Sequence, residues 1–303
     1  MTTLAVTGCS GYVGRRLCEL LEEDESVGRV VGIDVREPSF STRNLEFYAT
    51  DVRSPDLTEV ITGCDAVVHL AVCYDGEDAE ITDVIVRGTR NVLDVVASSG
   101  AGKLIFVSSA AVYGDHADND RPLTESSPVR PSPGRAYGRA KARAEEEVEA
   151  FAAAHPEVVV TILRPTWILG PSLPPPLVDA AASQVARAAA GAASEWNAVH
   201  EDDAAAAIVH VLGHDVPGTF NVAAREVDGS SPEVSGIRLH ETGFAPVHSS
   251  RDALRAAEPV LHGWVRVGGL RFRPRWIGIA AASIAAVIAG SAARAARVRR
   301  TSG

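Results

Sequence analysis

Short apolar runs alternate with longer amphipathic segments through the first half of the chain. The apolar runs are 4–7, 30–33, 66–70, 104–107 and 158–163, and the segments with helical periodicity are 14–22, 84–97 and 136–151. Because the apolar runs do not alternate by face, both faces of each strand are expected to be buried under helices. The pattern therefore predicts an α/β fold built on a doubly wound parallel sheet.

The alternation of strand and helix segments ends after Leu163. Prolines interrupt the pattern there, at Pro165, at Pro171 and in the triplet 174–176. An alanine-rich helical stretch follows, which indicates a smaller lobe partly interleaved with the sheet. The predicted divisions are a sheet domain over 1–165, a small substrate lobe over 166–270 and a C-terminal tail over 271–303.

The predicted tail differs in composition from the rest of the chain. From Arg271 onward there are seven arginines and no acidic residue, and the uncharged, alanine-rich segment 276–293 lies between them. Its 18 residues are at the lower limit for crossing a bilayer, and alanine contributes little to insertion. A helical basic tail that contacts a membrane surface, one that docks on a partner and an ordinary soluble helix all remain open.

Composition narrows the class of protein. The chain has 303 residues, 46% of them hydrophobic, which is enough for a large core. Its net charge of -10 argues against nucleic acid as a partner. The four cysteines show neither the spacing of a metal site nor a disulfide framework, so no metal is expected. The N-terminus enters a strand directly, without a leader, which predicts a cytoplasmic enzyme unless the tail associates with a membrane.

A glycine motif, TGCSGYVG, follows the first strand at residues 7–14. Its GxxGxxG spacing permits a tight turn and a close backbone approach to a pyrophosphate, which then lies against the N–H groups that open the next helix. We therefore expect a dinucleotide bound in a Rossmann-type domain. The residues expected to hold it are Gly8, Gly11, Tyr12, Val13 and Gly14.

An acidic residue ends the second strand at the position that selects the cofactor. Asp34 lies twenty residues after Gly14, where a carboxylate accepts hydrogen bonds from the adenosine ribose and repels a 2′-phosphate. This favours NAD. Arg36 leaves NADP open, because a nearby guanidinium can pair with that phosphate.

A tyrosine and a lysine lie four residues apart in the sequence YGRAK. On a helix, this spacing puts Tyr137 and Lys141 on one face, and an ammonium together with a positive nicotinamide favours the phenolate. Tyr137 is then a candidate base, and Lys141 a candidate ligand of the cofactor ribose. Lys141 is one of only two lysines in the chain, which suggests a role that arginine does not fill.

Taken together, these motifs resemble the extended short-chain dehydrogenase/reductase family, in its NAD-dependent epimerase/dehydratase branch, from residue 1 to about residue 225. The resemblance implies a strand that passes beneath the cofactor and a loop that meets its adenine ring. The residues implied as further cofactor contacts are Asp51 and Val52 at the adenine, Leu70, Ala71 and Val72 at the riboses, and Pro165 at the nicotinamide carboxamide.

The resemblance also selects a catalytic serine. The strand KLIFV leads into SSAAVYG, and the family's serine or threonine stands four residues before the tyrosine of VYG, here Tyr113. This implies Ser109 as the catalytic residue and Ser108 as a structural one. With Tyr137 and Lys141, Ser109 completes the expected catalytic set.

Other polar residues near these motifs are interpreted as structural. His69 is expected to be a packed histidine at a strand end, and Glu145 a surface or helix-pair carboxylate. Asp202 or Asp203 is expected to cap a helix N-terminus.

The chain departs from the family pattern in two respects. Ile85 stands where the family usually has an asparagine that helps shape the site and its water-linked proton route. Fewer than thirty residues separate Pro171 from His200, whereas sugar-nucleotide enzymes generally place a longer diphosphate-binding segment there. A nucleotide-sugar substrate is therefore one option among several.

The leading hypothesis is an NAD(P)-dependent oxidoreductase or epimerase that acts on a hydroxyl or carbonyl carbon of a small molecule. The alternatives are a hydroxysteroid-dehydrogenase-like enzyme on a lipophilic alcohol and a non-catalytic NAD-binding sensor. A homodimer is the expected assembly.

Overall fold

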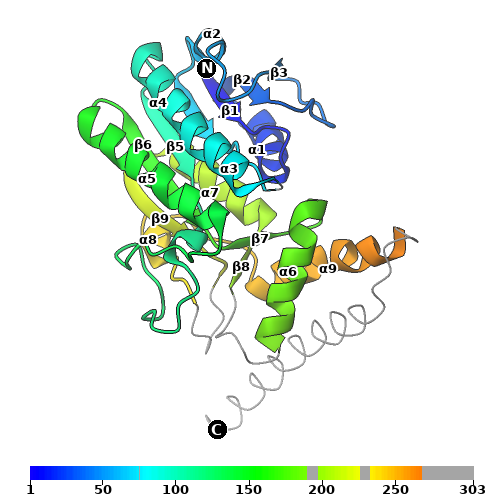
Figure 1. The fold of residues 1–303 in the computed structure, drawn as a ribbon. Coiled ribbons are helices and arrows are strands. Elements are labelled where there is room, and N and C mark those ends of the chain that lie inside the picture. Colours follow the sequence, from blue (N-terminus) through cyan, green and yellow to red (C-terminus); the bar gives the residue numbers. More distant parts are fainter. Residues whose placement is uncertain (75, 190–196, 226–232, 268–303) are drawn as a thin grey trace.

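A seven-stranded parallel sheet forms the centre of the structure (Figure 1). The structure is a computed structural model that describes residues 1–74, 76–189, 197–225 and 233–267. Its strand order is β3-β2-β1-β4-β5-β6-β9, and every neighbouring pair is parallel. The strands are β1 (Thr2–Thr7), β2 (Val27–Asp34), β3 (Leu45–Ala49), β4 (Ala66–His69), β5 (Lys103–Val107), β6 (Val159–Pro165) and β9 (Gly218–Val222). This confirms the predicted doubly wound sheet.

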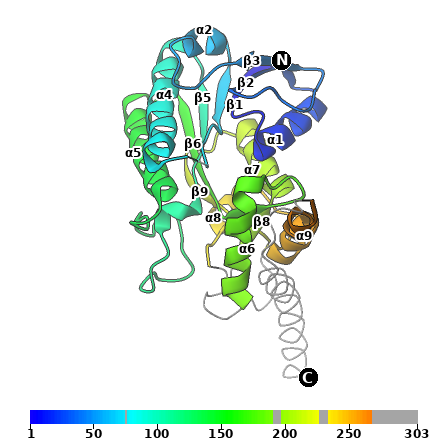
Figure 2. The ribbon, with the colours of Figure 1, turned by 45° about the vertical axis from the view of Figure 1, so that its right-hand side comes forward.

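Helices cover both faces of the sheet (Figure 2). On one face lie α2 (Leu57–Ile61), α3 (Asp78–Thr82), the π-helical turn η1 (Asp83–Arg87), α4 (Gly88–Ser99) and α5 (Ala136–Ala154), and on the other α1 (Tyr12–Glu23), α7 (Glu201–Gly213) and α8 (Ile237–His240). In β1, Ala5 packs toward the first layer, while Leu4 and Val6 pack toward the second. Because both faces are buried, the strands read as continuous apolar runs.

The order of the strands along the chain reverses between β1 and β4. In doubly wound sheets, ligands bind in the crevice outside the carboxyl ends of the two strands that flank such a reversal. The register pairs Thr7 with His69, so the segments that follow both strands begin side by side. The N–H of Leu70 donates to the Thr7 carbonyl at 3.1 Å. The glycine motif after β1 is therefore adjacent to the residues after β4.

A smaller cluster of elements lies beyond these carboxyl ends. It contains β7 (Trp167–Leu169) paired in parallel with β8 (Ala198–His200), together with α6 (Pro175–Ala189) and α9 (Ser250–Val267), and these elements share their own apolar core. Between β8 and α9 the chain returns to the main layers through α7, β9 and α8. The functional assignment of 166–270 as a substrate lobe stays a prediction. The predicted tail, 271–303, lies outside the described residues, and none of the helices described is long and apolar enough to cross a membrane.

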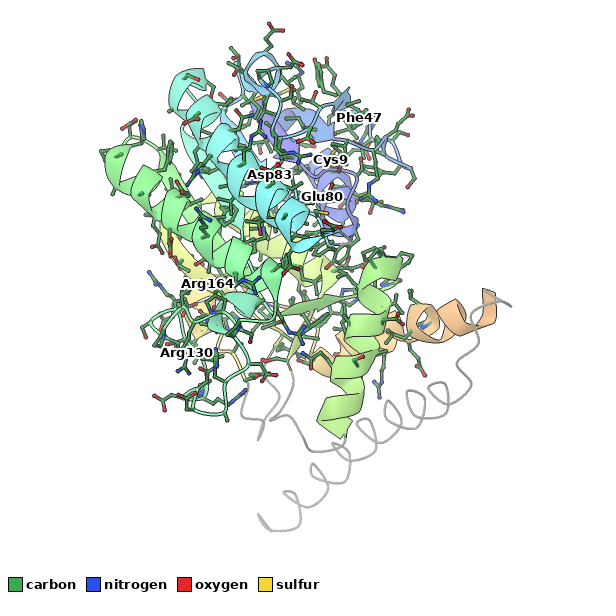
Figure 3. All side chains as sticks on the ribbon, in the orientation of Figure 1. Cys9, Phe47, Glu80, Asp83, Arg130 and Arg164 are labelled. Atoms are coloured by element: carbon green, nitrogen blue, oxygen red, sulfur yellow. The ribbon has the colours of Figure 1, made fainter. Side chains whose placement is uncertain are left out.

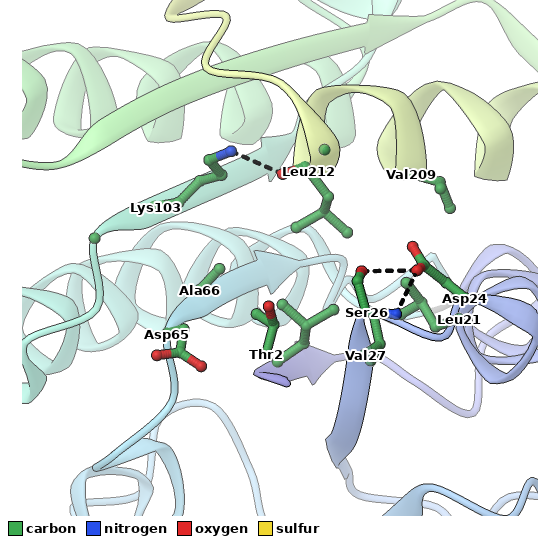
Figure 4. A pocket seen from close by; sticks show the side chains of 13 residues that line it. Thr2, Leu21, Asp24, Ser26, Val27, Asp65, Ala66, Lys103, Val209 and Leu212 are labelled. Carbon is green, nitrogen blue, oxygen red and sulfur yellow. Dashed lines mark hydrogen bonds between the residues drawn. The ribbon is translucent and has the colours of Figure 1, made fainter.

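A cavity of about 310 Å³ opens at the amino ends of the strands, the edge opposite the glycine motif (Figure 4). Lys103 lies at its border and donates from Nζ to the carbonyls of Leu212 at 2.8 Å and His214 at 3.1 Å. These carbonyls belong to the last turn and the C-cap of α7, and a cation is favourable there. Lys103 therefore caps the C-terminus of a helix at the amino ends of the strands. Lys141, the other lysine of the chain, lies at their carboxyl ends.

Candidate active site

The glycine motif forms a turn that side chains would obstruct. Gly8 has a φ of 73°, and a Cβ built there lies 2.8 Å from the Ala71 nitrogen. A Cβ on Gly14 lies 2.2 Å from the Gly8 carbonyl oxygen. Helix α1 begins just after Gly11, and no side chain caps its first N–H groups. The turn thus fits a bound pyrophosphate, which backbone N–H groups at a helix N-terminus hold well.

Substituting Gly14 with alanine is expected to weaken NAD binding by more than about tenfold, because the added methyl displaces the Gly8 carbonyl and deforms the turn. Titration calorimetry with NAD measures the change. Gly102→Ala is the matched control, since a Cβ at Gly102 meets nothing within 4 Å. Equal NAD affinity of Gly14→Ala and wild type would contradict the assignment of this turn.

Asp34 lies beside this turn at the end of β2. Its Oδ2 accepts from the Ser10 N–H at 3.1 Å and its Oδ1 from the Arg36 N–H at 3.0 Å. The Arg36 side chain is exposed. A carboxylate thus stands at the rim of the glycine turn, where a ribose is expected.

The carboxylate of Asp51 already has a strong partner in the protein. It accepts from Nε of Arg53 at 2.9 Å and Nη2 at 2.6 Å, and Arg53 also pairs with Asp83 at 2.8 Å. Arg53 holds the pKa of Asp51 below its usual value. Val52 is buried and packs on Gly88 at the start of α4. The sequence interpretation did not include Arg53, although its place two residues after an aspartate was visible.

His69 is the packed histidine that the sequence indicates. Its ring is 2% exposed, with Nδ1 at 2.7 Å from the Thr7 hydroxyl and Nε2 at 3.1 Å from the Thr89 hydroxyl. Burial, with a smaller contribution from the charge of Lys141, lowers its pKa to about 3. The histidine therefore stays neutral and fixes the end of β4, from which Leu70, Ala71 and Val72 continue beside the glycine turn.

Tyr137 lies in the first turn of α5, and the side chains of Ser109 and Tyr74 both act to lower its pKa. Ser109 caps the 3-10 turn η2 (Ala110–Tyr113) by accepting from the Ala111 N–H at 3.1 Å. The ring centroid of Tyr74 lies 5.6 Å from that of Tyr137. The role of Ser109 beside Tyr137 stays a prediction, and Tyr74 is a neighbour that the sequence interpretation did not include.

Lys141 lies one turn further along α5 and is 2% exposed. Its Nζ donates to the Val107 carbonyl at 2.7 Å and lies 4.8 Å from the centre of the Phe106 ring. Burial lowers the pKa of Lys141 to about 8. The ammonium is therefore anchored at the end of β5.

Burial opposes the ionisation of the Tyr137 phenol. Burial raises the pKa of Tyr137 to about 12, and the hydrogen bonds from Ser109 and Tyr74 offset only part of that rise. Desolvation thus exceeds any stabilisation of the phenolate by the lysine, because a phenolate removed from water loses its hydration.

Glu145 is buried and pairs with an arginine of β6, whereas the prediction was a surface or helix-pair carboxylate. Its oxygens accept from Nε of Arg164 at 3.0 Å and from Nη2 at 2.5 Å, and both side chains are 3% exposed. Arg164 also donates to the hydroxyl of Tyr113 at 3.0 Å, and that hydroxyl donates to Asn221 at 2.7 Å. Figure 3 labels Arg164 below α5. This network ties α5 to β6 and β9, and so fixes the helix that carries Tyr137.

The prediction that Asp202 or Asp203 caps α7 is wrong. The cap is His200, whose Nδ1 accepts from the Asp202 N–H at 3.1 Å. Asp202 pairs with Arg16 at 2.5 Å, and Asp203 accepts from the N–H of His248 at 2.8 Å. Because the ligand atoms of His200 and Asp202 are committed to these contacts, we assign no metal site to their cluster with His248.

Three further residues, Ile85, Pro165 and Ser108, were considered in the sequence and are buried near the carboxyl ends of the strands. Ile85 is 1% exposed within η1, so this turn directs an apolar side chain inward at the departure from the family pattern. Pro165 is the buried last residue of β6. The buried hydroxyl of Ser108 has no hydrogen-bond partner among the described residues. A buried unpaired hydroxyl at the end of β5 is consistent with a ligand at this edge.

Comparison with known proteins agrees with this geometry. The model of the NAD dependent epimerase/dehydratase family matches residues 4–223. The chain belongs to this family. Membership confirms the family, the nicotinamide-dependent class of enzyme and the fold that the sequence predicts.

Curated relatives of this family member differ in their named activities. An uncharacterized protein of Sinorhizobium fredii is 31% identical over 74% of this chain and 57% of its own length. An N-acetyl-alpha-D-glucosaminyl-diphospho-ditrans,octacis-undecaprenol 4-epimerase of Escherichia coli is 35% identical over 54% of the chain and 48% of its own length. A sterol-4-alpha-carboxylate 3-dehydrogenase of Saccharomyces cerevisiae is 29% identical over 56% of the chain and 52% of its own length. The chain thus spans less than two thirds of each of these relatives.

Solved structures share the fold. MoeE5 in complex with UDP-glucuronic acid and NAD superposes with a TM-score of 0.70 at 22% identity, covering 87% of this chain and 99% of MoeE5. DesIV of Streptomyces venezuelae, a dTDP-glucose 4,6-dehydratase with NAD and TYD bound, gives 0.69 at 23% identity, covering 90% and 99%. RMD of Pseudomonas aeruginosa was solved with NADPH. Both nicotinamide cofactors therefore occur within this fold.

Proposed function

We propose that this family member transfers hydride between NAD and a hydroxyl or carbonyl carbon of a small molecule, with Ser109, Tyr137 and Lys141 as its catalytic residues. The observation that supports this most is the anchoring of Lys141, four residues after Tyr137 on α5, by its Nζ on the carbonyl of Val107 at 2.7 Å. Val107 is the last residue of β5, and Ser109 follows it at the carboxyl edge of the sheet. The glycine turn lies at the same edge, after β1, which β4 separates from β5.

Each residue has a distinct task in this proposal. Tyr137 takes the proton of the substrate alcohol, or returns it to a ketone, and Ser109 orients the reacting oxygen toward the phenol. Lys141, anchored on the Val107 carbonyl, is placed to bind ribose hydroxyls and to supply a positive charge near the base. NAD, when bound, would supply the hydride acceptor and the positive charge of its nicotinamide.

Asp34 is proposed to select NAD over NADP. Asp34→Asn removes the charge that opposes a 2′-phosphate and keeps the side-chain volume, so the ratio of NADP to NAD affinity is expected to rise by about tenfold or more. Calorimetric titration with both cofactors measures that ratio. Glu37→Gln, an exposed neutralisation three residues later, is the control for a general charge effect. An unchanged ratio in Asp34→Asn would exclude this role.

A nucleotide sugar is the substrate class that the named relatives favour, since a UDP-glucose 4-epimerase and a dTDP-glucose 4,6-dehydratase are among them. A lipophilic alcohol is the second candidate, supported by the sterol dehydrogenase and by the short segment between Pro171 and His200.

A substrate screen of the NAD-loaded protein tests the function. Nucleotide sugars and sterol alcohols are supplied as separate panels, and both nicotinamide absorbance and product stereochemistry are recorded. An epimerase inverts a centre with no net absorbance change, whereas a dehydrogenase accumulates reduced cofactor. Binding of NAD without turnover in either panel would favour a non-catalytic sensor. A homodimer remains the expected assembly, which analytical ultracentrifugation measures.

A further inference from the structure

Glu201 is a buried carboxylate to which the proposed reaction gives no task. It is the first residue of α7, directly after β8, and it is 4% exposed. Its Oε2 accepts from the N–H of Ser172 at 3.1 Å, and a Cβ built on Gly170 lies 2.3 Å from its carboxyl carbon. The carboxylate therefore lies against the backbone of the segment that follows β7.

The start of α7 lies at the edge of the sheet that carries the glycine turn. Lys103 caps the end of α7 at the amino ends of the strands, so the first residue of this helix lies at their carboxyl ends. Asp202 on α7 pairs with Arg16 on α1, and the two helices lie side by side (Figure 2). Because α1 begins at the glycine turn, Glu201 is level with the N-terminus of α1.

The helix face that carries Glu201 belongs to the proposed site. Ala204, three residues later on the same face, lines a small cavity of about 10 Å³ together with Val13, Val107 and Pro165. Val13 is part of the glycine motif, and Pro165 is an expected contact of the nicotinamide carboxamide. Glu201 therefore lies at the rim of the edge where cofactor and substrate are proposed to meet.

The charge of Glu201 is not balanced by a cation within the described part of the chain. It forms no ion pair there, and its hydrogen-bond donors all belong to Ser172. The charged groups that act on it, Arg16 and Asp202, are paired with each other. Burial raises the pKa of Glu201, because the donors of Ser172 replace only part of the lost hydration. A further donor supplied by a ligand would therefore stabilise this carboxylate.

We propose that Glu201 is a specificity-determining residue of the substrate site, which accepts a hydrogen bond from a hydroxyl or ammonium group of the substrate and opposes an anionic group at that position. A carboxylate has about four acceptor positions, so it can accept from a substrate without releasing Ser172. A nucleotide sugar would meet Glu201 through its sugar hydroxyls, with its diphosphate repelled from this position. The inference rests on the proposed function for the presence of an alcohol or ketone at this edge.

Three ring alcohols that differ in charge test this role. The probes are trans-4-aminocyclohexanol, cyclohexane-1,4-diol and 4-hydroxycyclohexanecarboxylate, which are positive, neutral and negative at pH 7. Their dissociation constants from the full chain saturated with NAD are measured by ligand-observed NMR, which detects weak binding. The wild type is expected to bind the ammonium probe about tenfold or more tightly than the carboxylate probe.

Glu201→Gln removes the charge and keeps an oxygen that can accept from Ser172. The affinity for the ammonium probe is expected to fall by about tenfold, that for the carboxylate probe to rise, and that for the diol to change least. Glu241→Gln, which neutralises an exposed carboxylate just after α8, is the control and keeps the wild-type order. If Glu201→Gln does not fold, as judged by circular dichroism, Glu201→Met replaces it with the same expected loss.

Equal affinities of the wild type and Glu201→Gln for all three probes would overturn the proposal, as would failure of every probe to bind the wild type. Binding requires no turnover, so charge-dependent binding together with a failed substrate screen would reject the proposed function and leave the assignment of Glu201 standing. Turnover in the screen, with probe affinities unaffected by Glu201→Gln, would reject the assignment of Glu201 alone.

Discussion

Replacing Tyr137 with phenylalanine is expected to lower kcat by about 10³-fold, within the range that a positioned general acid or base contributes. The phenol oxygen is the proposed proton acceptor, and phenylalanine removes it while keeping the ring. NAD affinity is expected to stay near the wild-type value, because the glycine turn and Asp34 are untouched. Rates with the substrate found in the screen, and calorimetry with NAD, measure the two quantities.

Tyr48→Phe is the matched control for this variant, since it removes a phenol hydroxyl from β3 and is expected to keep full activity. A Tyr137→Phe enzyme that retains most of the wild-type kcat would refute the assignment of the base. A parallel loss of NAD binding would instead indicate that Tyr137 acts mainly in holding the cofactor.

The fold was predictable because the strands are buried on both faces and therefore appear as continuous apolar runs. The glycine turn was predictable because its steric requirement is visible in the local sequence. Gly8 and Gly14 occupy positions where a Cβ meets backbone atoms within 3 Å, so glycine is required at both. The helical spacing of Tyr137 and Lys141 is likewise a local property.

Contacts between distant segments were not predictable in the same way. Nothing within α5 indicates that Glu145 meets Arg164, because their pairing depends on how the helix lies on β6. Tyr74 lies in a loop with no periodicity, and only the tertiary structure brings it to Tyr137. The burial that raises the pKa of Tyr137 is also a tertiary property, since spacing indicates a neighbouring lysine but does not report burial.

Glu145→Gln is expected to destabilise the protein by about 3–5 kcal/mol, the cost of leaving one member of a buried ion pair without its charge partner. Arg164 is 3% exposed and cannot recover hydration in place of the lost carboxylate. Urea denaturation measures the change as a lower midpoint.

Glu147→Gln tests the same substitution two residues later on α5, where the pair with Arg90 is partly exposed, and the midpoint is expected to remain nearly unchanged. Joint replacement of Glu145 by leucine and Arg164 by methionine is expected to restore much of the stability, since no buried charge is then left unpaired. A midpoint in Glu145→Gln equal to that of Glu147→Gln would contradict the burial of this pair.

The double variant also separates stability from catalysis. Tyr137, Lys141 and Glu145 follow one another at four-residue intervals on α5, so the network that holds Glu145 also sets the rotation of the helix face that carries the proposed catalytic groups. If apolar packing restores the denaturation midpoint while kcat stays low, the ion pair contributes orientation beyond stability. If both recover together, packing of α5 on β6 is sufficient to place Tyr137.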